Sequence, residues 1–248
     1  MNNSYDFTSV SYKLAVVAAL IMILAILGHR LSIVAFQPAL LGLALGTLIG
    51  LLAIAFGLFE MIRATKAKKT QKTPIVSTSP AAGSTLGLLV VAPIFVTLLA
   101  GIGTPMIHDI TTDLEHPPEF IAIKALRAVT DNSLERNEPE NLAALQKQSY
   151  PDLVSLLLDR PFETVFEQAV ALVKKRGWEV TVISAANGRI EATDTTLIMG
   201  FKDDVIIRIE KKGKQTQVDM RSVSRVGKGD LGTNAARIRS FLDELGKD

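Results

Sequence analysis

Three long apolar stretches in the first part of this chain limit its possible folds more than any other feature. They cover about residues 12–30, 39–62 and 84–103. A helix that crosses the hydrocarbon core of a bilayer needs about 20 mostly apolar residues. The apolar part of the first span, Leu14 to Leu27, is short, but the flanking Lys13 and Arg30 can lengthen the span by snorkelling. The pattern therefore predicts a multi-pass membrane protein with three transmembrane helices.

A cleaved signal peptide is the alternative interpretation of the first stretch. Lys13 is the one basic residue before it, and no convincing small-x-small cleavage motif follows. Since two further apolar stretches come after it, we expect this segment to stay in the protein as a helix.

Charge is divided unevenly along the chain. Residues 1–103 hold seven Lys or Arg and two Asp or Glu, whereas residues 104–248 hold 20 and 23. Five of the seven early cations lie in the expected loop 63–83, and they are Arg63, Lys66, Lys68, Lys69 and Lys72. Short basic loops between spans stay in the cytoplasm. We therefore expect a bacterial inner (cell) membrane protein with a cytoplasmic N-terminus and with residues 104–248 in the periplasm.

The same charge distribution bears on partners. The basic cluster is explained by topology, so it does not indicate a nucleic-acid partner, and the expected partner of residues 1–103 is the lipid bilayer. The centres of the three spans carry no charge, which argues against an ion or proton transporter.

The second span carries a glycine at every fourth position, namely Gly42, Gly46 and Gly50. Residues at this spacing share one helix face, and glycine allows a second helix to approach closely. We favour packing against another span of the same chain. The alternative is a homodimer formed through the second span.

Residues 161–248 have the pattern of an α+β domain. An amphipathic helix begins after Pro161, two hairpins follow, and a second amphipathic helix covers about Leu231 to Leu245. The hairpins turn at Asn187-Gly188 and at Gly213-Lys214, both typical two-residue turns. The expected outer domain is therefore an antiparallel four-stranded sheet covered by two helices.

The second hairpin also predicts a register. With a two-residue turn at Gly213-Lys214, Ile206 pairs with Arg221 and Arg208 pairs with Asp219. One face of the sheet is then mostly apolar and the other carries charge, as in a sheet with one solvated face. Residues 104–160 are expected to form an extended strap or linker, because Pro117-Pro118 forbids helix there.

Catalytic and metal-binding patterns are weak. His108, Asp109, Asp113 and His116 are all metal-ligand types, but their spacing matches no standard site. The chain has no cysteine, which excludes thiolate chemistry. Ser222 and Ser224 lack a nearby histidine base. We expect no cofactor.

The run Gly227-Lys-Gly-Asp-Leu-Gly232 fits G-x-G-x-x-G between a strand and a helix. A dinucleotide-binding fold needs a parallel strand, and here the preceding strand belongs to an antiparallel hairpin. A smaller hypothesis is that the helix start and Arg225 bind an anion. The alternative is that Asp230 caps the helix while the arginines pair with Asp203, Asp204 or Asp219.

Several short motifs lie within residues 104–246, and the most specific is Arg221-Ser-Val-Ser-Arg-Val-Gly227. The others are His108-Asp-Ile-Thr-Thr-Asp113, Pro117-Pro-Glu-Phe120, Tyr150-Pro-Asp152, Gly177-Trp178, Gly200-Phe-Lys-Asp-Asp-Val-Ile-Ile-Arg208 and Gly227-Lys-Gly-Asp-Leu-Gly232. In these motifs the chain resembles the domain-of-unknown-function family 1499. The resemblance implies a domain of bacterial and plastid proteins, some of them membrane-anchored, and it implies no particular activity.

The resemblance also selects polar positions. They are Asp109, Thr112, Asp113, Asp204, Arg208, Arg221, Ser224, Arg225, Asp230 and Asn234. Our hypothesis is that the strap segment Asp109–Asp113 docks against the arginines of the last strand in one polar cluster at the sheet edge. This cluster would be either structural or a small-anion site.

The sequence thus favours a membrane-anchored periplasmic module with a non-enzymatic binding or envelope-assembly role, whose partner is an envelope protein or a small anion. The alternative is an envelope-associated hydrolase that uses the acidic and histidine residues of the strap with Ser222 and Ser224.

Overall fold

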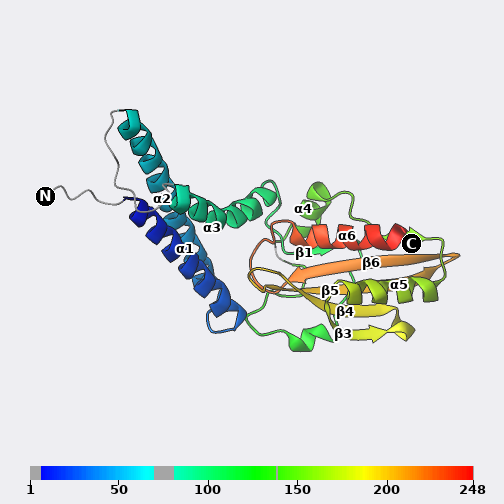
Figure 1. Ribbon diagram of the computed structural model, residues 1–248. Coiled ribbons are helices and arrows are strands. Elements are labelled where there is room, and N and C mark those ends of the chain that lie inside the picture. Colours follow the sequence, from blue (N-terminus) through cyan, green and yellow to red (C-terminus); the bar gives the residue numbers. More distant parts are fainter. Residues whose placement is uncertain (1–6, 70–80, 138, 248) are drawn as a thin grey trace. The chain divides into compact units, whose positions relative to one another are not determined.

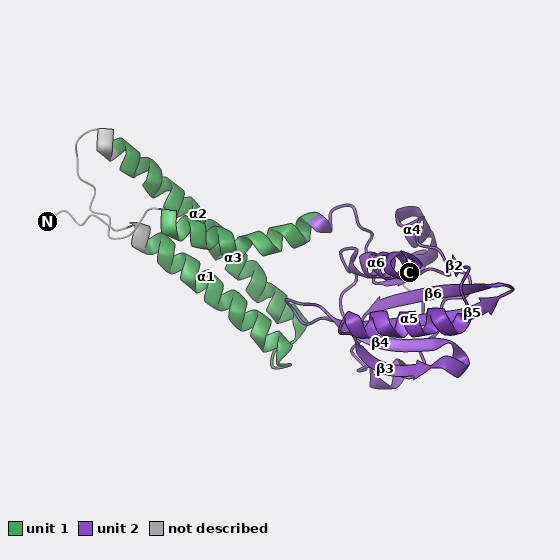
Figure 2. Cartoon of the chain, turned by 45° about the vertical axis from the view of Figure 1, so that its right-hand side comes forward, with its two compact units in different colours: residues 1–99 green, residues 100–248 purple. Residues whose placement is uncertain are grey.

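The computed structural model describes residues 7–69, 81–137 and 139–247. The chain forms two compact units, residues 1–99 and 100–248, which are coloured separately in Figure 2. Figure 1 shows that the first unit is helical, whereas the second contains the sheet.

The first unit is built from three apolar helices. They are α1 (Phe7–Arg30), α2 (Phe36–Lys69) and α3 (Ala81–Ala100), and each is long and apolar enough to cross a membrane. Large apolar side chains such as Leu24, Leu41 and Leu89 are exposed on the helix surfaces, which suggests association with a membrane. Because α2 continues to Lys69, Arg63 and Lys66 are helical, and residues 70–80 of the expected basic loop lie outside the described residues.

The three glycines of α2 lie at helix contacts within the chain. A Cβ atom at Gly42 would lie 2.8 Å from Ala25 Cβ, and one at Gly46 would overlap Met22. At Gly50 it would lie 2.5 Å from Val91 Cγ2 on α3. This glycine face therefore receives α1 and α3 of its own chain, and a homodimer through α2 stays a prediction.

The second unit contains six strands and not the four that we expected. They are β1 (Asp109–Thr111), β2 (Leu156–Leu158), β3 (Glu179–Ser184), β4 (Arg189–Thr195), β5 (Lys202–Lys212) and β6 (Gln215–Ser224). The antiparallel order is β1-β6-β5-β4-β3, and β2 also pairs with β6. The two additional strands come from residues 104–160 and share the outer edge of β6, whose backbone groups would otherwise lack partners.

The predicted register of the second hairpin is confirmed. Ile206 pairs with Arg221 and Lys212 with Gln215, so the turn has two residues, with Gly213 at φ +63°. The first hairpin differs, because Ser184 pairs with Arg189 and leaves a four-residue loop. Its short 3-10 turn η2 (Ala185–Asn187) ends at Gly188, whose φ is +56°.

Two helices cover one face of the sheet, as Figure 1 shows. They are α5 (Phe162–Lys175) and α6 (Thr233–Lys247). The core between them and the sheet includes Ile207, Met220 and Phe241, all completely or almost completely buried.

The opposite face of the sheet is also covered, whereas we expected it to be solvated. Residues 112–136, which include the short 3-10 helix η1 (Ile123–Leu126), lie over it, and Phe120 and Ile123 pack on Ile206 and Val223. We call this second face the strap face. Its charged side chains pair with charged residues of the segment 104–160 that covers them. The helix α4 (Leu142–Ser149) lies in the same segment and supplies Gln146, which accepts from Arg136.

Candidate functional site

The first cluster of charges on the strap face is centred on Asp109. Arg221 donates from Nε to Oδ1 over 3.0 Å and from Nη2 to Oδ2 over 2.7 Å. Arg136 donates to the same carboxylate, and its Nη2 also donates to Gln146 of α4 over 3.1 Å. Both Asp109 and Arg221 are almost completely buried. One carboxylate on β1 thus joins β6 to Arg136, which in turn contacts α4.

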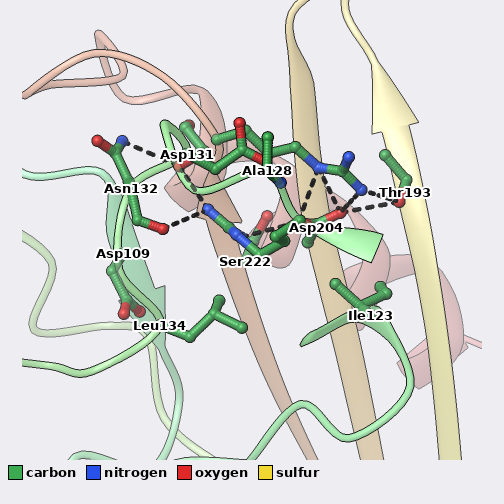
Figure 3. Close-up of polar contacts among 12 residues, drawn as sticks. Asp109, Ile123, Ala128, Asp131, Asn132, Leu134, Thr193, Asp204 and Ser222 are labelled. Atoms are coloured by element: carbon green, nitrogen blue, oxygen red, sulfur yellow. Dashed lines mark hydrogen bonds and ion pairs between the residues drawn. The ribbon is translucent and has the colours of Figure 1, made fainter. Parts of the chain in front are cut away.

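A second cluster is centred on Asp204 of β5, which is fully buried. Figure 3 shows dashed lines that converge on this carboxylate beside Thr193. Arg127 donates to Oδ2 over 2.8 Å, and Arg225 donates from Nη2 to Oδ1 over 2.8 Å. The Thr193 hydroxyl donates to Oδ1 over 2.8 Å. Asp204, like Asp109, therefore serves two guanidinium groups.

A third cluster is centred on Asp219 of β6. Arg208 bridges it to Asp113, with Nη2 at 2.9 Å and 2.8 Å from the two carboxylates. The hydroxyls of Thr112 and Ser155 donate to Asp219 over 2.9 Å and 2.6 Å. Burial alone would raise the pKa of Asp113, but hydrogen bonds from the His116 N–H and Arg208 outweigh burial and lower this pKa.

Glu191 of β4 anchors the strap in a different way. Its fully buried carboxylate accepts the backbone N–H groups of Ile121 (3.0 Å), Ala122 (3.3 Å) and Ile123 (2.8 Å). It therefore supplies acceptors for the otherwise unbonded donors at the start of η1.

The residues around the start of α6 form a separate cluster on the helix-covered face. The fully buried Ser222 hydroxyl donates to Asn234 Oδ1 over 2.6 Å, and Asn234 Nδ2 donates to Ser224 Oγ over 2.9 Å. Arg237 donates to Asp203 over 2.6 Å. These bonds tie α6 to the strands β5 and β6.

Asp230 caps α6. Its carboxylate accepts the Gly232 N–H over 2.9 Å and the Asn234 N–H over 2.7 Å, so it occupies the position where an external anion would bind. Burial raises the pKa of Asp230, although these hydrogen bonds oppose the shift.

The structure thus divides the residues that we grouped in one cluster. It brings Asp109 to Arg221, Thr112 to Asp219 and Asp113 to Arg208. It does not bring Arg225 to the strap acids, because Arg225 pairs with Asp204. The remaining members, Ser224, Asp230 and Asn234, belong to the cluster at α6.

The four metal-ligand candidates also separate. His108 Nδ1 lies 3.4 Å from the Lys228 carbonyl oxygen, while His116 donates its backbone N–H to Asp113. Asp109 and Asp113 pair with different arginines. Among the residues that the structure describes, no group of three or more His, Asp or Glu is placed to hold a metal ion.

One known protein family includes the residues of all of these clusters. The model of a family described as "Protein of unknown function (DUF1499)" matches residues 109–245. The chain belongs to the DUF1499 family. The match begins at β1 and ends within α6, so it includes every strand of the sheet and all of the strap except residues 104–108. No curated protein matches the chain.

The DUF1499 domain also contains a hollow over the strap-face arginines. It has a volume of about 640 Å³ and is lined by the strap between Pro117 and Arg136 and by Arg221. Arg127 and Arg136 are functional candidates that sequence reasoning missed, because they lie in a polar stretch with weak periodicity. Glu191 was missed for another reason, since a glutamate on a strand is usually solvated.

Proposed function

We propose that this DUF1499 protein is a module anchored in the bacterial inner membrane, with a cytoplasmic N-terminus and a periplasmic outer domain that binds a partner without catalysis. Support for the anchor comes from the three apolar helices. The cations from Arg63 to Lys72, in the last part of α2 and just after it, favour the orientation, because basic segments are retained in the cytoplasm.

The observation that carries binding over hydrolysis is the placement of Ser222. Its hydroxyl is fully buried, donates to Asn234 over 2.6 Å and accepts from Arg237 over 3.1 Å. A serine nucleophile must be reached by substrate and activated by a base. Asp109, the central acid of the strap, is held by Arg221 and Arg136 instead. The engagement of Ser222 and Asp109 in these contacts supports binding over hydrolysis.

Orientation is tested by single cysteines, because the natural chain has none. One variant carries Val129→Cys, at a fully exposed position of the outer domain, and the other carries Ser77→Cys, between the second and third helices. In spheroplasts, a membrane-impermeant maleimide should label the first variant directly and the second only after detergent is added. The reverse pattern would place residues 104–248 in the cytoplasm and overturn the proposal.

A further inference from the structure

The hollow of the DUF1499 domain has a floor of buried arginines. Arg127, Arg136 and Arg221 line it, and their side chains are 6%, 12% and 4% exposed. Arginine is rarely buried to this degree unless its charge is matched by carboxylates. The balance of charge beneath the hollow therefore decides what the hollow can bind.

That balance is positive. Asp109 serves Arg136 and Arg221, and Asp204 serves Arg127 and Arg225. In these two clusters four guanidinium groups share two carboxylates. Asp131, which lines the hollow and attracts Arg127 and Arg225, offsets part of this excess of positive charge. An anion would complete the layer, since a buried charge without a partner is costly.

One buried donor in this layer is also left without an acceptor. Arg127 Nε is buried and has no hydrogen-bond partner among the residues that the structure describes. The two Nη atoms of the same guanidinium reach Asp204 and the Asn132 carbonyl, each over 2.8 Å. Burial lowers the pKa of Arg127 and of Arg136, with Asp204 and Asp109 opposing the shift respectively.

The mouth of the hollow has a different charge pattern. Lys124 is exposed there, together with the exposed acids Glu119 and Glu135 and the half-buried Asp131. The lining is thus positive at depth and mixed at the mouth. Water screens the exposed acids more effectively than the buried arginines.

We propose that this hollow binds the phosphate group of a small phosphorylated molecule, with Arg127 and Arg136 beneath the phosphate and Lys124 at its edge. A phosphate monoester carries about 1.5 to 2 negative charges near neutral pH, so it supplies the negative charge that the two buried carboxylates leave unmatched. Its oxygens accept several hydrogen bonds from guanidinium groups. The inference deepens the proposed function, because it gives the binding module a class of ligand.

The experiment uses the full chain in nanodiscs of phosphatidylcholine. Trp178 is the only tryptophan, lies in the second unit and stacks on Phe241 with ring centroids 5.6 Å apart. Its fluorescence therefore follows the thermal unfolding of that unit alone. Inorganic phosphate, compared with chloride at equal ionic strength, should raise the transition temperature in a saturable way.

Four variants, one of them a control, identify the site. Arg127→Lys keeps a cation beside Asp204 but removes the unbonded Nε donor, and Lys124→Glu reverses an exposed charge without touching the core. Each should raise the phosphate concentration for half-maximal stabilisation by roughly three- to tenfold. Lys214→Glu makes the same charge change in the exposed β5–β6 turn, and it should leave this phosphate concentration unaltered. Glu119→Gln should lower this concentration.

The outcomes separate clearly. No phosphate-specific rise, or an equal response in the wild type and in every variant, would overturn the proposal. If phosphatidic acid in the nanodisc raises the transition temperature and added phosphate has no further effect, the group bound in the hollow is the phosphate of a lipid headgroup. If inorganic phosphate acts equally in both lipids, the source is a soluble ester. Cysteine labelling does not depend on phosphate. The proposed orientation is therefore tested independently of phosphate binding.

Discussion

Asp109 and Arg221 form a bidentate ion pair between β1 and β6, with nitrogen–oxygen distances of 3.0 Å and 2.7 Å. The two residues are 112 positions apart, and both side chains are at most 4% exposed. The pair therefore joins the start of the DUF1499 domain to its penultimate element, where solvent screens the charges little.

Removing either member of this pair should destabilise the second unit, but the two substitutions should differ in their cost. Arg221→Met leaves Asp109 with Arg136, whereas Asp109→Asn leaves two guanidiniums without their carboxylate. Breaking a buried pair costs about 3–5 kcal/mol, and we expect Asp109→Asn to be the more costly. Urea unfolding, monitored by Trp178 fluorescence, measures the loss of stability in both variants. Arg239→Ala, which breaks an exposed pair with Asp152, is the control and should cost about 1 kcal/mol or less.

Glu191→Gln should loosen the strap. The amide has one acceptor oxygen in place of two, so one or more of the N–H groups of residues 121–123 loses its partner. A buried donor without a partner costs about 1–3 kcal/mol. Trypsin cleavage after Lys124 and Arg127 should become faster than in the wild type. Cleavage at an unchanged rate would mean that this carboxylate does not hold the strap.

Ser222→Ala should lower stability by about 1 kcal/mol, because Asn234 and Arg237 each lose a hydrogen-bond partner. Urea unfolding of the full chain measures the change. A variant as stable as the wild type would contradict the structural role of this hydroxyl and would restore Ser222 as a candidate nucleophile.

Asp230→Asn should change the pH dependence of stability. Burial raises the pKa of Asp230 in the folded chain, so the folded state binds a proton more tightly than the unfolded state. The wild type therefore loses stability as pH rises from about 3.9, the ordinary aspartate value, through the raised pKa. Asparagine caps a helix about as well as aspartate and has no charge to desolvate.

The measurement is the free energy of unfolding of both proteins between about pH 4 and pH 7. The variant minus wild-type difference should increase with pH. A difference that decreases with pH would show that the ionised carboxylate stabilises the fold.

Elements with a local signal could be predicted from the sequence. The alternation in residues 204–226 and the Gly213-Lys214 turn together predict the register of β5 and β6 that the structure has. The strands β1 and β2 have three residues each, too few for a periodic signal, and they form only because β6 presents an open edge. Their pairing depends on contacts far apart in the sequence.

The candidate site was harder to predict for the same reason. The sequence pattern places Arg221 and Asp219 on the charge-bearing face, and that placement is confirmed. Whether such a face is solvated depends on what covers it, and the covering residues lie about 90 to 110 positions earlier. Arg127 and Arg136 become buried only through partners on other elements, so nothing in their own segment distinguishes them from solvated arginines.

The position of β1 ahead of its partner β6 sets the order in which the outer unit can be completed during synthesis. The 112 positions between Asp109 and Arg221 take roughly 6–22 s at ordinary rates of translation. During that interval the strap has no strand to pair with, and its charged side chains stay hydrated. The polar composition of the strap therefore suits a segment that stays in contact with water until β6 has been synthesised.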